Sequence, residues 1–119
     1  MARTSIKNMN IKQGGIFLAN LNPIKGHEQA GTRPVIILQN NILNKNLNTV
    51  IIIPITSNLS AKDKITTYFL AKNISSLNKD SVALLFQIRT INKNRLTKKI
   101  SELNKQTFRK LKNQFNFVI

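Results

Sequence analysis

The 119-residue sequence predicts one small, mainly β domain: a small antiparallel barrel covered by a C-terminal helix. Three observations predict this class. Short segments rich in Ile, Val, Phe and Thr recur between polar connections, no long crossover separates them, and the last segment changes to a helical period. A chain of this length forms one domain with one core. We expect that domain over residues 13–119, after a flexible basic leader over residues 1–12.

Five segments are predicted as strands, because each is short, rich in β-branched or aromatic residues, and bounded by Asn, Ser, Gly or Lys. Two further segments are predicted as connections. Residues 41–48, NILNKNLN, have the length of a helical turn, but their asparagines favour a loop. Residues 57–64, SNLSAKDK, are expected to be flexible. The predicted strands are 15–21 (GIFLANL), 34–40 (PVIILQN), 49–55 (TVIIIPI), 65–70 (ITTYFL) and 81–91 (SVALLFQIRTI).

The C-terminal segment NKQTFRKLKNQFNFVI predicts an amphipathic helix. Phe108, Leu111 and Phe115 fall at positions i, i+3 and i+7, so they share one face of a helix, and the lysines and arginine lie mostly elsewhere. Asn104 precedes this pattern and is the expected N-cap. The apolar face is therefore predicted to pack on the sheet.

The charge balance predicts a polyanionic partner. Lysine and arginine total 19 against four acids, a formal net charge of +15. Nucleic acid is the favoured partner, because every neutralised phosphate releases counterions. A membrane surface or an acidic protein is the alternative. The chain has no cysteine and no apolar run approaching about 18 residues, so we expect a cytoplasmic protein without disulfides, thiolate chemistry or a membrane span.

The sequence lacks the residues and motifs that several kinds of active site require. The acids are widely separated, which disfavours a two-metal nuclease, and the single histidine, His27, cannot form a histidine pair. Phosphate-binding GxxxxGK[ST] and GxGxxG motifs and the GxSxG elbow are absent, so no cofactor and no metal is expected. The four acids are Glu28, Asp63, Asp80 and Glu102.

Cleavage of RNA suits the residues that remain. The 2'-OH attacks its own phosphorus, so the protein needs to align it, offset the charge of the phosphorane and assist proton movement. An arginine on a rigid strand does this through two parallel hydrogen bonds to phosphate oxygens. Arg33 fits, because Pro34 biases it toward extended geometry where a loop becomes a strand. A Thr or Ser at the end of a neighbouring strand would add a hydrogen bond.

The motif order resembles the MazF/PemK (Kid) family of toxin endoribonucleases over roughly residues 12–118. The most specific parts are the loop GHEQAGTRP (26–34), the strand end PIT (54–56) and the block DSVALLFQIRTI (80–91). The resemblance implies an SH3-like antiparallel β-barrel with a C-terminal helix, a fold shared with the CcdB gyrase poisons. It also implies a protein that acts as a homodimer in the cytoplasm. It also implies a metal-independent ribonuclease that cuts single-stranded RNA to 2',3'-cyclic phosphate and 5'-OH ends, and an acidic MazE-like antitoxin that occupies the RNA groove.

The resemblance assigns roles position by position. The family's catalytic arginine and threonine match Arg33 and Thr56. Glu28 is expected to orient Arg33 or to act as a base, and which group takes the 2'-OH proton stays open. Gln29 is expected to lie with Glu28 over the groove, and further RNA contacts are expected in the loop and at the ends of the neighbouring strands. The predicted RNA-binding residues are His27, Gln29, Ser57, Ser81 and Gln87.

Three positions depart from the family pattern. Gly15 replaces an acid that commonly begins the first strand, Phe86 replaces an acid before the Gln-Ile-Arg-Thr block, and Asn92 replaces the Asp that often follows it. Phe86 is expected to stack on a base or to fill a dimer interface. Two rival functions stay open: a gyrase inhibitor of the CcdB kind, which would not need Arg33 and Thr56, and a non-catalytic RNA-binding protein.

Overall fold

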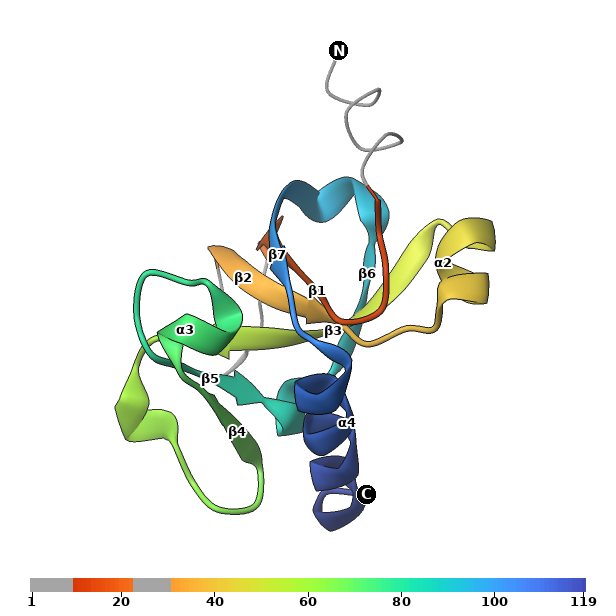
Figure 1. Ribbon diagram of the computed structural model, residues 1–119. Helices are drawn as coiled ribbons and strands as arrows, with labels where there is room; N and C mark the ends of the chain where they lie inside the picture. The colour runs from red at the N-terminus through yellow and green to blue at the C-terminus, as the bar shows by residue number, and fades with distance from the viewer. Residues whose placement is uncertain (1–9, 23–30) are drawn as a thin grey trace.

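A computed structural model describes residues 10–22 and 31–119, and these form a bent antiparallel sheet with a helix at its C-terminal side (Figure 1). The strands follow the order β4-β5-β3-β2-β1-β7, and β6 pairs with β3 beside this path. Every pairing between described strands is antiparallel, so the predicted mainly β class with a C-terminal helix is confirmed. The strands are β1 (Gly15–Asn20), β2 (Thr32–Ile37), β3 (Thr49–Thr56), β4 (Thr67–Leu70), β5 (Ser81–Leu84), β6 (Arg89–Asn92) and β7 (Leu96–Glu102).

The helices are short except for the last. α2 (Asn41–Asn46) joins β2 to β3, α3 (Lys72–Ser75) joins β4 to β5, and α4 (Lys105–Gln114) follows β7. The 3₁₀ turns are η1 (Leu59–Ala61), η2 (Leu85–Gln87), η3 (Lys93–Arg95) and η4 (Phe115–Phe117).

The sheet buries apolar residues on both faces, which explains the nearly continuous Ile and Val runs of β2 and β3. Neighbouring residues of one strand belong to different clusters: Ile16 to the first and Phe17 to the second, as strand alternation requires. The first cluster comprises Ile16, Ile36, Ile53, Ile55, Leu70, Ala83, Leu85, Leu103, Leu111 and Phe115. The second comprises Phe17, Ala19, Leu21, Val35, Ile37, Val50, Ile52, Ile91 and Leu96.

The helix α4 forms as predicted and closes the first cluster. Asn104 is its N-cap, and the Asn104 side chain accepts a hydrogen bond of 2.7 Å from the N–H of Thr107. Leu111 and Phe115 are buried in the cluster, and Phe108 packs against it. The spacing of three apolar residues was therefore sufficient to orient this helix.

The predicted loop at 41–48 is wrong, because residues Asn41–Asn46 form α2. Asn40 caps the helix by accepting a hydrogen bond of 2.9 Å from Leu43 N–H. The buried amide of Asn44 donates to the carbonyl of Gln39 at 2.8 Å, and Gln39 Nε2 donates back at 2.9 Å. Asparagines that suggested a loop thus serve as a cap and a tertiary contact.

The single strand predicted over 81–91 is also wrong, because η2 divides it into β5 and β6. Both pieces pair with β3: β6 pairs along Thr49–Ile52, and β5 pairs at Ile55 and Thr56. Pro54 lies in the gap between them and has no N–H to donate, which favours an interrupted partner there. Two elements, β7 and α3, were not predicted at all.

Candidate functional site

Arg33 and Thr56 lie at the same end of two neighbouring strands. Val35 pairs with Pro54 in the β2–β3 ladder, and extending this register by two residues brings Arg33 opposite Thr56. Arg33 is the second residue of β2, pairs with Ala19 of β1, and is partly exposed. The structure therefore brings together the two residues expected to be catalytic, on one face of the sheet.

Thr56 is nearly buried, with 5% of its surface exposed. Its Oγ1 accepts a hydrogen bond of 3.1 Å from the N–H of Asn58, two residues further along. Accepting this bond fixes the hydroxyl and leaves its own hydrogen for an acceptor. A phosphate oxygen is such an acceptor.

Ser57 and Ser81 lie across the β3–β5 ladder from one another. Ile55 pairs with Ala83 and Thr56 with Val82, so the register continues to Ser57 and Ser81. Strand alternation gives them the opposite face from Thr56, still at the strand ends. Ser81 is buried, and its hydroxyl donates to the carbonyl of Lys79 at 3.0 Å.

A pocket of about 560 Å³ gathers three of the predicted residues, Arg33, Ser57 and Ser81. Thr56 and Gln87 do not line it. Its walls come from β1, β2, β3, β7 and the connection between α3 and β5. The lining residues are Leu18, Thr32, Arg33, Pro34, Ile55, Ser57, Ser76, Leu77, Asn78, Lys79, Ser81, Lys98, Lys99 and Ile100.

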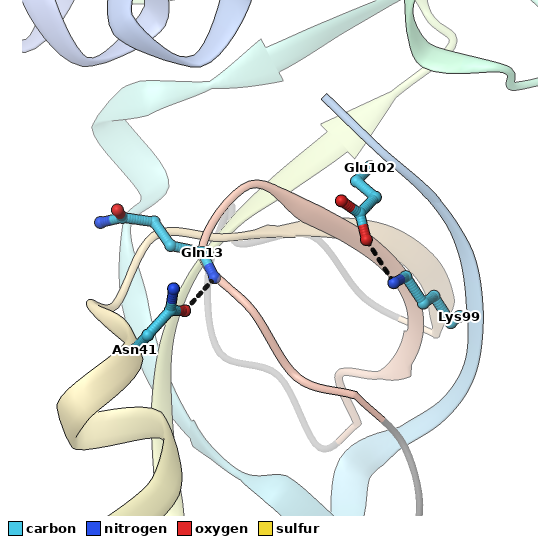
Figure 2. Close-up of polar contacts among 4 residues, drawn as sticks. All are labelled: Gln13, Asn41, Lys99 and Glu102. Carbon is cyan, nitrogen blue, oxygen red and sulfur yellow. Dashed lines mark hydrogen bonds and ion pairs between the residues drawn. The ribbon is translucent and has the colours of Figure 1, made fainter. Parts of the chain in front are cut away.

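The lysines of this pocket differ in their partners. Lys99 Nζ lies 2.5 Å from Glu102 Oε1, and Figure 2 shows this pair on β7. The hydrogen bond and the charge of Lys99 hold the pKa of Glu102 below its ordinary value. Within residues 10–22 and 31–119, no other ion pair occurs, so Lys79 and Lys98 are not neutralised by a described carboxylate. No sequence pattern marks Lys79, Lys98 or Lys99 as site residues, because one lysine among many in a basic chain carries no positional signal.

The loop predicted to cover the site, with His27, Glu28 and Gln29, lies outside the described residues. The residues on either side of it, Leu21, Asn22 and Gly31, are described, and they are called the neck of the loop. Leu21 N–H donates to the Gly31 carbonyl at 2.9 Å, and Gly31 N–H donates to the Asn22 side chain at 3.0 Å. Gly31 has φ +72°, a left-handed conformation that glycine adopts without strain. The neck is thus closed beside Arg33.

Arg95 adds a clamp to this neck. Its guanidinium Nη1 donates to the carbonyl of Asn20 at 3.1 Å and also to the carbonyl of Asn22. These bonds join the start of β7 to the end of β1, where the loop leaves the sheet. No pattern in the sequence marked Arg95 for this contact.

Gln87 and Arg89 lie where the chain passes from β5 to β6, beside β3. Gln87 ends η2, and Arg89 pairs with Ile52 in the ladder between β6 and β3. Among residues 10–22 and 31–119, Arg89 Nη1 is buried and has no hydrogen-bond partner, a costly arrangement for a charged group. The neighbouring Phe86 is 52% exposed, so it fills no core within the described part of the chain.

A second pocket, of about 710 Å³, lies at the other end of β2 and β3 and contains none of the predicted site residues. Gln13 N–H donates to Asn41 Oδ1 at 2.8 Å on its border, drawn in Figure 2. Asn92 also lines it, and the Asn92 side chain accepts from Asn94 N–H at 2.8 Å, capping η3. Asparagine and aspartate cap equally well, so the departure at Asn92 preserves this local structure.

Within the described ranges, no three His, Cys, Asp or Glu residues gather into a group suited to a metal ion. The described helices are too short or too polar for any of them to cross a membrane.

The fold and the site define a small antiparallel β domain that carries a cationic pocket with an arginine at its rim. The chain matches the family model of the PemK-like, MazF-like toxin of type II toxin-antitoxin system over residues 12–119. It therefore belongs to this family, and the resemblance of the sequence motifs is confirmed.

A curated relative and two solved structures are similar to this chain in sequence or in fold. Endoribonuclease MazF of Staphylococcus saprophyticus is 43% identical over 104 residues, which make up 87% of this chain and 86% of that protein. The crystal structure of MazF from Deinococcus radiodurans has a TM-score of 0.78 at 20% identity and covers 93% of this chain and 97% of its own. A mycobacterial endoribonuclease in complex with its cognate antitoxin has a TM-score of 0.67 at 19% identity, with 90% and 91% covered. At these identities, the two structures establish the shared fold.

Proposed function

We propose that this toxin is a metal-independent endoribonuclease that cleaves single-stranded RNA by attack of a 2'-OH on the adjacent phosphorus. The observation that carries the proposal is the β2–β3 register, which extends to Arg33 opposite Thr56, while Arg33 also lines a cationic pocket. The 43% identical relative is an endoribonuclease. Cleavage by this route needs alignment and charge stabilisation, which an arginine and a hydroxyl supply.

In the proposed step, the 2'-oxygen forms a bond to phosphorus, and the bond from phosphorus to the 5'-oxygen breaks. Arg33 donates two hydrogen bonds to the phosphorane oxygens and assists proton delivery to the leaving 5'-oxygen. Thr56 donates a hydrogen bond to a phosphate oxygen. Glu28 orients Arg33 or takes the 2'-OH proton. The products are a 2',3'-cyclic phosphate and a 5'-OH end.

The remaining predicted residues are proposed as RNA contacts. Ser57 and Ser81 meet the RNA in the pocket, Gln87 meets it from the turn η2 between β5 and β6, and His27 and Gln29 meet it from the loop. These side chains read base edges of a splayed single strand, the usual way in which RNA sequence is recognised.

We further propose the assembly in which the toxin works: a homodimer, held inactive in the cytoplasm by an acidic antitoxin. The mycobacterial neighbour in complex with its cognate antitoxin supports the second part. The charge of +15 supports an acidic partner, because opposite charges steer association. The toxin domain is proposed to span residues 13–119.

The test is cleavage of a defined single-stranded RNA in EDTA, with both new ends mapped. We expect cuts at a fixed short sequence with cyclic phosphate ends, and Arg33→Ala should reduce kcat at least about 100-fold. Thr56→Ser should retain activity, and Thr56→Val should lose it. Arg109→Ala is the matched control, because Arg109 is exposed on α4, outside the pocket.

Other outcomes separate the rival functions. RNA that is bound and left intact would identify an RNA-binding protein. Arrested gyrase with no effect on RNA would identify an inhibitor of the CcdB kind. Cleavage that persists in Arg33→Ala would remove Arg33 from the chemistry.

A further inference from the structure

The pocket beside Arg33 has an apolar floor. Leu18 pairs with Pro34 on one side and with Lys98 on the other, so one row crosses β2, β1 and β7. Ile55 continues the row on β3, and Ile100 and Leu77 complete the apolar lining. A floor of this kind excludes water and suits the flat face of a nucleobase.

The rim of the pocket is cationic and polar. Lys98 stands at the end of the apolar row, two strand spacings or about 10 Å from Pro34. Lys79 enters from the connection before β5, where its carbonyl is held by the Ser81 hydroxyl at 3.0 Å. Arg33 completes the rim next to Pro34.

The carboxylates of the described chain leave two of these cations uncompensated. Glu102 pairs with Lys99. Asp80, the neighbour of Lys79, accepts the N–H of Lys72 at 2.8 Å at the start of α3. No described carboxylate lines the pocket, so Lys79 and Lys98 present their charge to a ligand.

We propose that this pocket binds the nucleotide next to the scissile phosphate of single-stranded RNA, with its base on the apolar floor and its phosphate between Lys79 and Lys98. This assignment rests on the proposed ribonuclease function and extends it to β7 and to the connection before β5. The volume of about 560 Å³ lies within the roughly 300–1,000 Å³ of small-ligand sites. Lys98 and Lys79 bind substrate in the ground and transition states alike.

The first experiment measures the salt dependence of binding. A mixed-sequence RNA with 2'-O-methyl groups binds without being cleaved, and its affinity is measured in EDTA over a salt series. Each of Lys98→Gln and Lys79→Gln should lower the slope of log K against log salt by about 0.7 and weaken binding about fourfold at 0.15 M salt. Lys110→Gln on the exposed side of α4 is the matched control and should change neither.

The second experiment locates the contact. A methylphosphonate replaces one phosphate at a time around the mapped cleavage site. When the methylphosphonate replaces the phosphate that Lys98 contacts, at one linkage adjacent to the scissile bond, Lys98→Gln should cause no further loss of affinity. With the methylphosphonate at any other linkage, Lys98→Gln should still weaken binding. With cleavable RNA, Lys98→Gln should raise KM and leave kcat unchanged, as expected for uniform binding.

If Lys98→Gln and Lys110→Gln changed the RNA affinity and its salt dependence equally, the proposed binding pocket would be wrong, because the lysine charge would then act without a defined site. A melting temperature unchanged in every variant ensures that folding is not the cause. If the wild type binds with the expected slopes and does not cut RNA in EDTA, the ribonuclease proposal fails, and the pocket stands as a binding site for single-stranded RNA without a role in cleavage. If it cuts RNA and the slopes do not respond to Lys79 or Lys98, only the pocket fails.

Discussion

Replacing Gly15 with alanine should destabilise the fold, although members of the family commonly carry an acid there. A Cβ at Gly15 would lie 2.9 Å from Cε1 of Phe17 and 3.0 Å from the carbonyl oxygen of Lys12. Phe17 is fully buried in the second cluster, and the Lys12 carbonyl accepts the Gly15 N–H at 2.9 Å. Neither neighbour can withdraw cheaply, so the substitution overpacks the start of β1.

The expected magnitude follows from the size of the protein. Overpacking of this kind costs about 1–3 kcal/mol. An unfolding entropy of about 2.1 cal/mol/K per residue gives roughly 0.25 kcal/mol/K for 119 residues. The melting temperature of Gly15→Ala should therefore fall by about 4–12 °C.

Thermal unfolding followed by circular dichroism measures this shift. Gly31→Ala is the matched control, because no atom of the described residues lies within 4 Å of its added Cβ, so the strain of φ +72° is tested in place of overpacking. That strain costs about 1–2 kcal/mol. Gly15→Asp, which restores the acid, should be at least as unstable as Gly15→Ala. A melting temperature of Gly15→Ala equal to that of the wild type would refute the packing argument.

Three other changes have defined outcomes. Asn104→Ala should cost about 1 kcal/mol in urea unfolding by removing the cap of α4; an unchanged midpoint would show that the cap contributes nothing. Asp63→Asn should lower stability at neutral pH. Hydrogen bonds from the hydroxyl and N–H of Thr66 and the N–H of Ile65 lower the pKa of Asp63, so its stabilisation is present above its ordinary pKa and is lost as pH falls through the lowered value. The stability difference should close on acidification, and a pH-independent difference would contradict this origin. Arg89→Met should leave the melting temperature unchanged or raised, because Arg89 Nη1 is buried and no described residue is its hydrogen-bond partner. A loss of about 3–5 kcal/mol in the free energy of unfolding would reveal a partner.

Most of the sheet could be predicted from local pattern, because β2 and β3 are rich in β-branched residues and β1 contains Ile, Phe and Leu between polar or glycine-containing ends. The division between β5 and β6 could not, since it occurs opposite Pro54, some 30 positions away, and depends on how β3 is paired. The strand β7 has the sequence LTKKISE, in which polar residues outnumber apolar ones and no two apolar residues are adjacent. It exists because it pairs with β1, which local sequence does not encode.

In the candidate site, too, some features follow from local sequence and others depend on strand pairing. The strand-end position of Arg33 follows from the proline after it, but its place opposite Thr56 depends on the register of β2 and β3. The register is set by which apolar residues each face buries, a property of the whole sheet. Lys79, Lys98 and Arg95 acquire their positions only when the strands assemble, so a basic composition conceals them.

The contacts of Leu21 and Asn22 with Gly31 hold the end of β1 and the start of β2 together. Arg95 adds the start of β7 to this junction through the carbonyls of Asn20 and Asn22. The position from which β2 continues to Arg33 is therefore held by described residues that flank the segment 23–30. The same property invites transplantation of the segment from one toxin of the family into another, to ask whether the choice of RNA sequence travels with it.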